Sequence, residues 1–86
     1  MDELKNKIEE TTDLFYQQKV NEAYESFIQL LPQISVFAES LSEEEKREEL
    51  LGVLAPALEA LEQKDSILLA DILQYELLEI LEDLEA

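Results

Sequence analysis

Apolar residues recur at steps of three and four along almost the whole chain, and this period constrains the fold more than any other feature. Such spacing places side chains on one face of an α-helix, whereas a half-buried strand requires alternation. No sustained alternation is present, and the 86 residues contain a single glycine. The sequence therefore predicts an all-α protein.

Four helical segments follow from the period, covering residues 2–18, residues 20–41, a stretch that begins at 42, and a stretch from 66 nearly to the end. We expect one domain, residues 1–86, folded as a small four-helix bundle of two antiparallel helical hairpins. The residues expected in its core are Ile8, Phe15, Ala23, Phe27, Leu30, Ile34, Phe37, Leu50, Leu54, Leu61, Leu69, Leu73, Leu77 and Ile80.

Two prolines fall inside the apolar stripes. A proline within a helix removes one backbone hydrogen bond and crowds the carbonyl four residues earlier. Because the apolar stripe continues unbroken through Pro32, we expect a kink there in one long helix, with a break before a second helix as the alternative. Pro56 crowds the carbonyl of Gly52, the only glycine, so this pair predicts a bend.

Polar residues mark two helix starts. The order Ser42-Glu43-Glu44-Glu45 is typical of a capping box, in which Ser42 and Glu45 satisfy each other's backbone N–H groups. Asp65, after the turn Gln63-Lys64, is expected to cap the last helix.

The charge balance excludes several classes of partner. Six Lys and Arg against 22 Asp and Glu give a formal net charge of −16. Phosphate backbones and anionic membrane surfaces both require clustered basic residues. We therefore expect no nucleic acid and no membrane partner, whereas a basic protein would associate faster with such a chain.

Other absences point to a cytoplasmic protein. There is no cysteine, which fits a reducing compartment. The acidic start, Met1-Asp2-Glu3, does not resemble a secretory signal. No apolar run approaches the roughly 20 residues of a membrane span.

The residues needed for catalysis are also missing. The chain has no histidine, the commonest general base near neutral pH. One glycine cannot form a phosphate-binding loop, and the Glu-x-x-His pairs of a di-iron bundle are absent. We expect no enzyme, no cofactor, no metal site and no small-molecule substrate.

The last helix carries two apolar stripes. The main stripe contains Leu69, Leu73, Leu77, Ile80 and Leu84. A second stripe, Leu68, Ile72 and Tyr75, lies toward the acidic side with the spacing that a helix offers to another groove or helix. Either this helix is covered on both sides within the bundle, or the second stripe is an interface. In the second case the partner-binding residues are Leu68, Ile72, Tyr75, Glu79 and Glu82.

Two stretches resemble known proteins. Residues 14–27 resemble the turn of a tetratricopeptide repeat, where an aromatic-rich helix meets a helix beginning with an acid-alanine pair, here Glu22-Ala23. Gln18 replaces the usual glycine, and no second motif follows, so no peptide groove is implied. Residues 70–77 look like those of small uncharacterised acidic helical proteins of bacteria. In its small size and acidity the chain also resembles the flagellar and type III secretion chaperones.

These observations favour a non-catalytic protein–protein interaction module that binds a partner helix, or a second copy of itself as a homodimer, through the last helix. The alternative is a small acidic export or assembly chaperone for one client. An acidic mimic of nucleic acid and a carboxylate metal enzyme are two further hypotheses.

Overall fold

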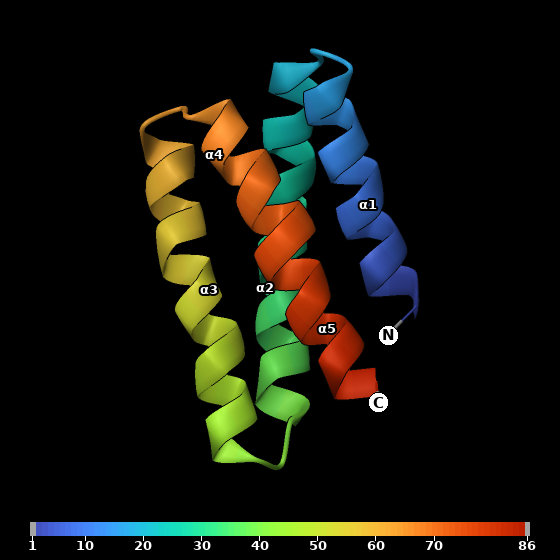
Figure 1. The fold of residues 1–86 in the computed structure, drawn as a ribbon, viewed down its shortest axis with the longest axis vertical. Helices are drawn as coiled ribbons and strands as arrows, with labels where there is room; N and C mark the ends of the chain where they lie inside the picture. The colour runs from blue at the N-terminus through green and yellow to red at the C-terminus, as the bar shows by residue number, and fades with distance from the viewer. Residues whose placement is uncertain (1, 86) are drawn as a thin grey trace.

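The computed structural model describes residues 2–85, and their helices form an antiparallel bundle (Figure 1). The elements are α1 (Asp2–Tyr16), α2 (Val20–Ser40), α3 (Glu44–Glu62), α4 (Ser66–Asp71), η1 (Ile72–Leu77) and α5 (Leu78–Glu85). The last three elements follow one another without a turn, and we call them together the C-terminal rod. The rod makes the fourth helix of the bundle, so the predicted all-α four-helix architecture is confirmed.

Successive helices run in opposite directions, so the bundle has an up-down-up-down order (Figure 1). The rod packs against α1 on one side and α3 on the other, while α2 contacts α1 and α3. The rod and α2 therefore occupy opposite corners of the bundle. One side of the rod is left without a helical neighbour within the described chain, as Figure 1 shows from the front.

The first and third reversals have the same local design. At the end of α1, the Lys19 N–H donates to the Leu14 carbonyl at 2.9 Å and the Gln18 N–H to the Phe15 carbonyl at 3.1 Å. At the end of α3 the Asp65 and Lys64 N–H groups repeat this pattern. This pairing is the Schellman motif, which needs a left-handed residue at the first position beyond the helix cap.

Neither left-handed position is occupied by glycine. Gln18 has φ 68° and Lys64 has φ 56°. A side chain in this region costs roughly 1–2 kcal/mol, which glycine avoids. Both turns therefore form at a local cost that the packing of the flanking helices offsets.

The predicted capping box at Ser42 is wrong. Helix α3 begins at Glu44, and its N-cap residue is Glu43, which makes no side-chain capping bond. The connection from α2 is held instead by Arg47, whose guanidinium donates to the Leu41 carbonyl at 3.1 Å. Asp65, by contrast, caps α4 as predicted, because its carboxylate accepts from the Leu68 N–H at 3.1 Å.

Both proline-containing helices are continuous. Helix α2 passes through Pro32, and α3 passes through Pro56. The apolar stripe of α2 keeps its register across Pro32, and Ala23, Phe27, Leu30 and Ile34 are all buried. Packing of that stripe outweighs the lost hydrogen bond. The alternative of a break at Pro32 is thus excluded, while the degree of bending stays a prediction.

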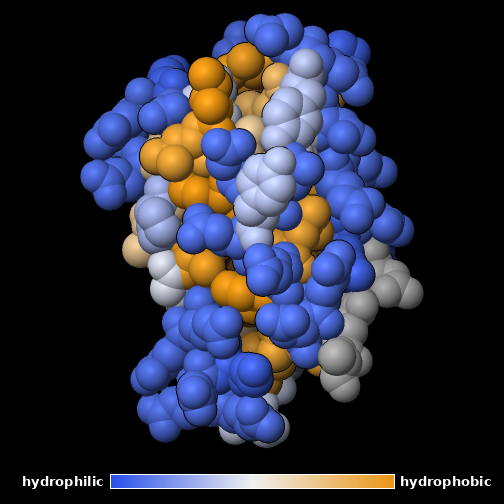
Figure 2. All heavy atoms as spheres, in the orientation of Figure 1, coloured by the Kyte–Doolittle hydropathy of each residue, from blue (hydrophilic) through white to orange (hydrophobic). Residues whose placement is uncertain are grey.

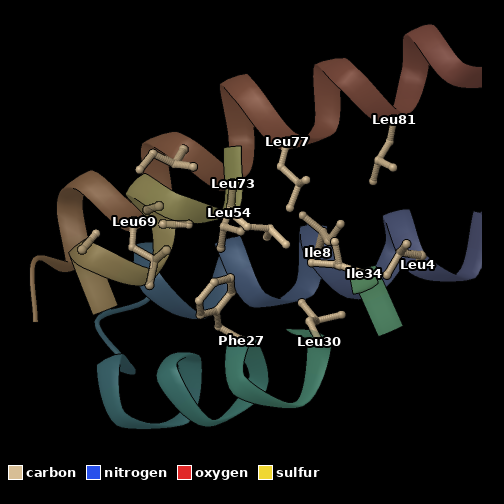
Figure 3. Packing of buried hydrophobic residues seen from close by; sticks show 14 of the residues in the cluster. Leu4, Ile8, Phe27, Leu30, Ile34, Leu54, Leu69, Leu73, Leu77 and Leu81 are labelled. Atoms are coloured by element: carbon tan, nitrogen blue, oxygen red, sulfur yellow. The ribbon is translucent and has the colours of Figure 1, made fainter. Parts of the chain in front are cut away.

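The core lies along the axis of the bundle and takes residues from all four helices. Figure 3 shows Leu77 and Leu81 of the rod pointing toward Ile8 and Leu4 of α1 and Ile34 of α2, with Phe27 farther along. The expected core residues are buried except Phe37, Leu61 and Ile80, which are partly buried against it. Alanines of α2, α3 and α4 are also buried in it.

Two polar residues of α1, Thr11 and Thr12, are also buried. Thr11 has no exposed surface. Its hydroxyl bonds to the Lys7 carbonyl at 2.9 Å and shares a hydrogen bond with the Ser26 hydroxyl of α2 at 2.5 Å. Because its hydrogen-bonding capacity is used inside the protein, burial costs little.

The middle of the rod is a π-helix. The Leu78 N–H donates to the carbonyl of Leu73, five residues earlier, in place of the fourth. In an α-helix, three successive steps of four residues rotate a side chain by about 120° away from its starting face. A π-turn takes about one residue more per turn and offsets this drift. Leu69, Leu73, Leu77 and Leu81 are therefore all buried on one side.

This rephasing explains a difference from the predicted core. The sequence stripe continues from Leu77 to Ile80 and Leu84, as an unbroken α-helix requires. In the structure Leu81 is fully buried, whereas Ile80 and Leu84 are only partly buried.

Candidate functional site

Large apolar side chains are exposed on the rod and on the end of α1 beside it. Ile67 is 77% exposed, Tyr75 61% and Leu68 45%, and Tyr16 of α1 beside them is 54% exposed. Figure 2 shows this side of the molecule, where patches of hydrophobic atoms alternate with hydrophilic ones and the borders are mostly hydrophilic. We call Tyr16, Ile67, Leu68, Asp71 and Tyr75 the rod face.

The predicted anchor Ile72 does not belong to the rod face. Its side chain is only 3% exposed and is part of the core. The rod contacts α3 on one flank through α4 and η1, so an apolar residue on that flank is covered within the bundle. Of the second stripe, Leu68 and Tyr75 stay exposed and Ile72 does not.

Glu79 and Glu82, the two predicted acidic contributors, lie in α5 and are exposed. They follow the rod face toward the end of the chain, together with Glu76 and Asp83. No lysine or arginine occurs after Lys64 in the sequence. The rod is therefore negatively charged along its exposed length.

Tyr16 is held against the rod by a side-chain contact. Its hydroxyl donates a hydrogen bond to Oε1 of Gln74 in η1. Partial desolvation by the surrounding protein raises the pKa of Tyr16 above its ordinary value, and the nearby Tyr75 and Asp71 raise it further. The two tyrosines and Asp71 thus lie close enough to interact electrostatically, although Tyr16 is far from both in the sequence.

A pocket of about 240 Å³ opens beside the rod face, between the end of α1 and the start of the rod. Phe15, Val20, Ile67 and Ala70 provide apolar walls, and Tyr16 and Asp71 line it as well. Gln18 and Val20, at the left-handed turn between α1 and α2, also line the pocket.

The sequence did not indicate Tyr16, Ile67 or the pocket. Tyr16 follows Phe15 directly, so its neighbour carries the core position and Tyr16 reads as a surface residue. Its contact with residue 74 arises from the bundle order, which places the end of α1 beside the rod. The sequence did contain one indication of Ile67. Three consecutive apolar residues, Ile67, Leu68 and Leu69, cannot all lie on one buried face of a helix, so at least one of them is expected to be exposed.

Between residues 2 and 85, no group of three or more metal-ligating side chains comes together. In the same part of the chain, no helix combines the length and the apolar character that crossing a membrane needs.

Comparison with known proteins gives one match. No curated protein and no solved structure is similar to the chain at a significant level. Over its whole length, residues 1–86, the chain matches the family described as "Domain of unknown function (DUF8042)". The protein is therefore a member of the DUF8042 family.

Proposed function

We propose that this protein is a non-catalytic interaction module that binds a basic partner helix through the rod face. The observation that carries the proposal is the composition of residues 67–75. Three of the eight large exposed hydrophobic residues among the described positions, Ile67, Leu68 and Tyr75, fall in this short stretch. Tyr16 adds a fourth across the α1 contact.

Exposed tyrosines support a binding role for this surface. Tyrosine is enriched among residues that dominate binding energy, because it buries a large area and keeps a hydrogen-bonding group. Two of the three tyrosines of the chain, Tyr16 and Tyr75, lie on the rod face. Both side chains are more than half exposed, so neither is part of the core. In the proposal, Leu68 and Tyr75 are the apolar anchors that Ile72 was expected to share.

Charge selects the class of partner. A second copy of this chain would bring another rod without any basic residue against the first, and like charges across an interface are destabilising. The net charge of −16 extends that repulsion to the whole molecule. A basic amphipathic helix instead complements Asp71, Glu79 and Glu82, so we favour it over a homodimer.

The test is a tagged pull-down from cells of the source at about 0.15 M salt, with the double variant Leu68→Ser, Tyr75→Ser beside the wild type. The matched control is Val36→Ser, which changes an exposed apolar residue of α2. We expect a stoichiometric basic partner that is lost with the double variant and kept with the control.

Equal recovery of the partner by the double variant would overturn the proposal. Recovery of the protein alone, together with a dimer in solution that the double variant abolishes, would reassign the rod face to self-association. A single client bound by a folded monomer would support the narrower role of an export or assembly chaperone.

A further inference from the structure

The pocket beside the rod face combines features that a single side chain of a partner would recognise. At about 240 Å³ it exceeds the roughly 150 Å³ in which a buried cavity holds a benzene molecule. It therefore has room for one long side chain, and too little for a helix. Phe15, Val20, Ile67 and Ala70 form its apolar part.

Asp71 gives the pocket a negative charge. Asp71 lines the pocket, and no ion pair to it occurs among the described residues. No lysine or arginine lines the pocket either. A purely apolar occupant would leave this carboxylate near an apolar surface without a partner, which is unfavourable.

Tyr16 adds an aromatic ring in a fixed position, because its hydroxyl is bonded to Gln74. A guanidinium stacks on aromatic rings and pairs with carboxylates through two parallel N–H groups, whereas an ammonium does neither as well. The aliphatic stem of an arginine also covers apolar surface while its charged head stays near water.

We infer that this pocket is a subsite for one arginine side chain of the partner, with Asp71 pairing the guanidinium, Tyr16 stacking on it, and Ile67 and Ala70 contacting the stem. The inference rests on the proposed function, since it assigns one contact of the basic partner. It predicts that the partner helix carries an arginine near the residues that cover Leu68 and Tyr75.

The test needs no knowledge of the partner. Nα-acetyl-arginine amide is titrated into the labelled protein and followed by ¹H–¹⁵N NMR, beside the same amides of citrulline and lysine. Citrulline has nearly the same shape as arginine without the charge. We expect weak, saturable shifts confined to residues 15–20 and 66–71, with arginine bound roughly tenfold more tightly than citrulline and more tightly than lysine.

Two variants separate a specific pocket from general attraction to an acidic protein. Asp71→Asn and Glu48→Gln each remove one exposed negative charge, but Glu48 lies in α3, outside the pocket. Asp71→Asn should weaken arginine binding about tenfold, and Glu48→Gln should leave it unchanged. The NMR spectra themselves show whether each variant is folded.

Equal binding of arginine and citrulline, shifts spread over the acidic surface, or equal effects of the two variants would each overturn the inference. So would the absence of any saturable shift. A different result would contradict the proposed function, namely a partner that the Leu68→Ser, Tyr75→Ser variant still recovers in the pull-down. A partner that requires those residues but ignores Asp71→Asn would sustain the interaction module and remove the arginine subsite.

Discussion

Tyr16 donates a hydrogen bond to the side chain of Gln74 and so joins the end of the first helix to the middle of the last. This contact lies on the surface, and the Tyr16 ring lines the pocket. It gives the rod face a member from a second helix. Because the rod face takes residues from two helices, its shape depends on the packing of the bundle.

The first prediction concerns Ile72. Because the side chain is buried, Ile72→Ala should lower the free energy of unfolding by about 2–5 kcal/mol, and Ile72→Glu should unfold the protein. Denaturant unfolding followed by circular dichroism measures both. The neighbouring exposed change Ile67→Ala should alter stability by less than about 0.5 kcal/mol. A folded, stable Ile72→Glu protein would contradict the assignment of Ile72 to the core.

A second prediction concerns the left-handed turns. Gln18→Gly and Lys64→Gly should each raise the free energy of unfolding by about 1 kcal/mol, because glycine adopts positive φ without strain. Thermal and denaturant unfolding are the measurements. Glycine at Gln17, just before the first turn, should instead destabilise the protein. If glycine at Gln18 also destabilised it, the left-handed conformation would not cost what we infer.

The helix caps give a third prediction. Asp65→Ala should cost about 1 kcal/mol, since it removes the acceptor for the Leu68 N–H. Ser42→Ala should have almost no effect, because the α3 cap at Glu43 has no side-chain bond. If denaturant unfolding showed comparable losses of stability for both substitutions, the capping box predicted at Ser42 would be supported after all.

Gly52 provides a fourth. A Cβ atom built at this position meets nothing within 4 Å, and Gly52 lies inside α3. Gly52→Ala should therefore stabilise the protein by about 0.5–1 kcal/mol, and the reverse change at the exposed Ala55 should cost a similar amount. A loss of stability in Gly52→Ala would show that Pro56 needs the flexibility of glycine four residues earlier.

The fifth prediction concerns pH. The pKa of Tyr16 is raised in the folded protein, so folding favours the protonated hydroxyl. Its contribution to stability is complete below the ordinary tyrosine pKa of about 10 and is lost as pH rises through the higher folded value. Tyrosinate absorbance should show an ionisation step above the ordinary tyrosine pKa, and Tyr16→Phe should remove that step. Persistence of the step in Tyr16→Phe would assign it elsewhere.

The helices and most of the core could be predicted because the apolar period is nearly unbroken. The continuity of α2 through Pro32 follows from the same register, since Phe27, Leu30 and Ile34 need one face. The two reversals were harder to define, because Gln18 and Lys64 stand where glycine is the usual signal. Their left-handed conformation is imposed by the packing of the helices that they join.

The candidate site could be predicted only in part. Leu68 and Tyr75 were identified from spacing and are exposed. Ile72 was misassigned because an ideal helical wheel does not say which flank a neighbouring helix covers. Tyr16 joins the surface through a contact across 58 residues, which periodicity within one helix does not reveal.

The π-helical segment also bears on how relatives should be aligned. A relative lacking one residue between positions 72 and 77 would form an ordinary α-helix there. The steps between its counterparts of Leu69, Leu73, Leu77 and Leu81 would be four, three and four residues in place of four, four and four. The counterpart of Leu81 would still lie in the core. A DUF8042 member with this shorter spacing should therefore align to the present chain with a one-residue gap inside the helix, a place where gaps are ordinarily penalised, and it is expected to share the same bundle.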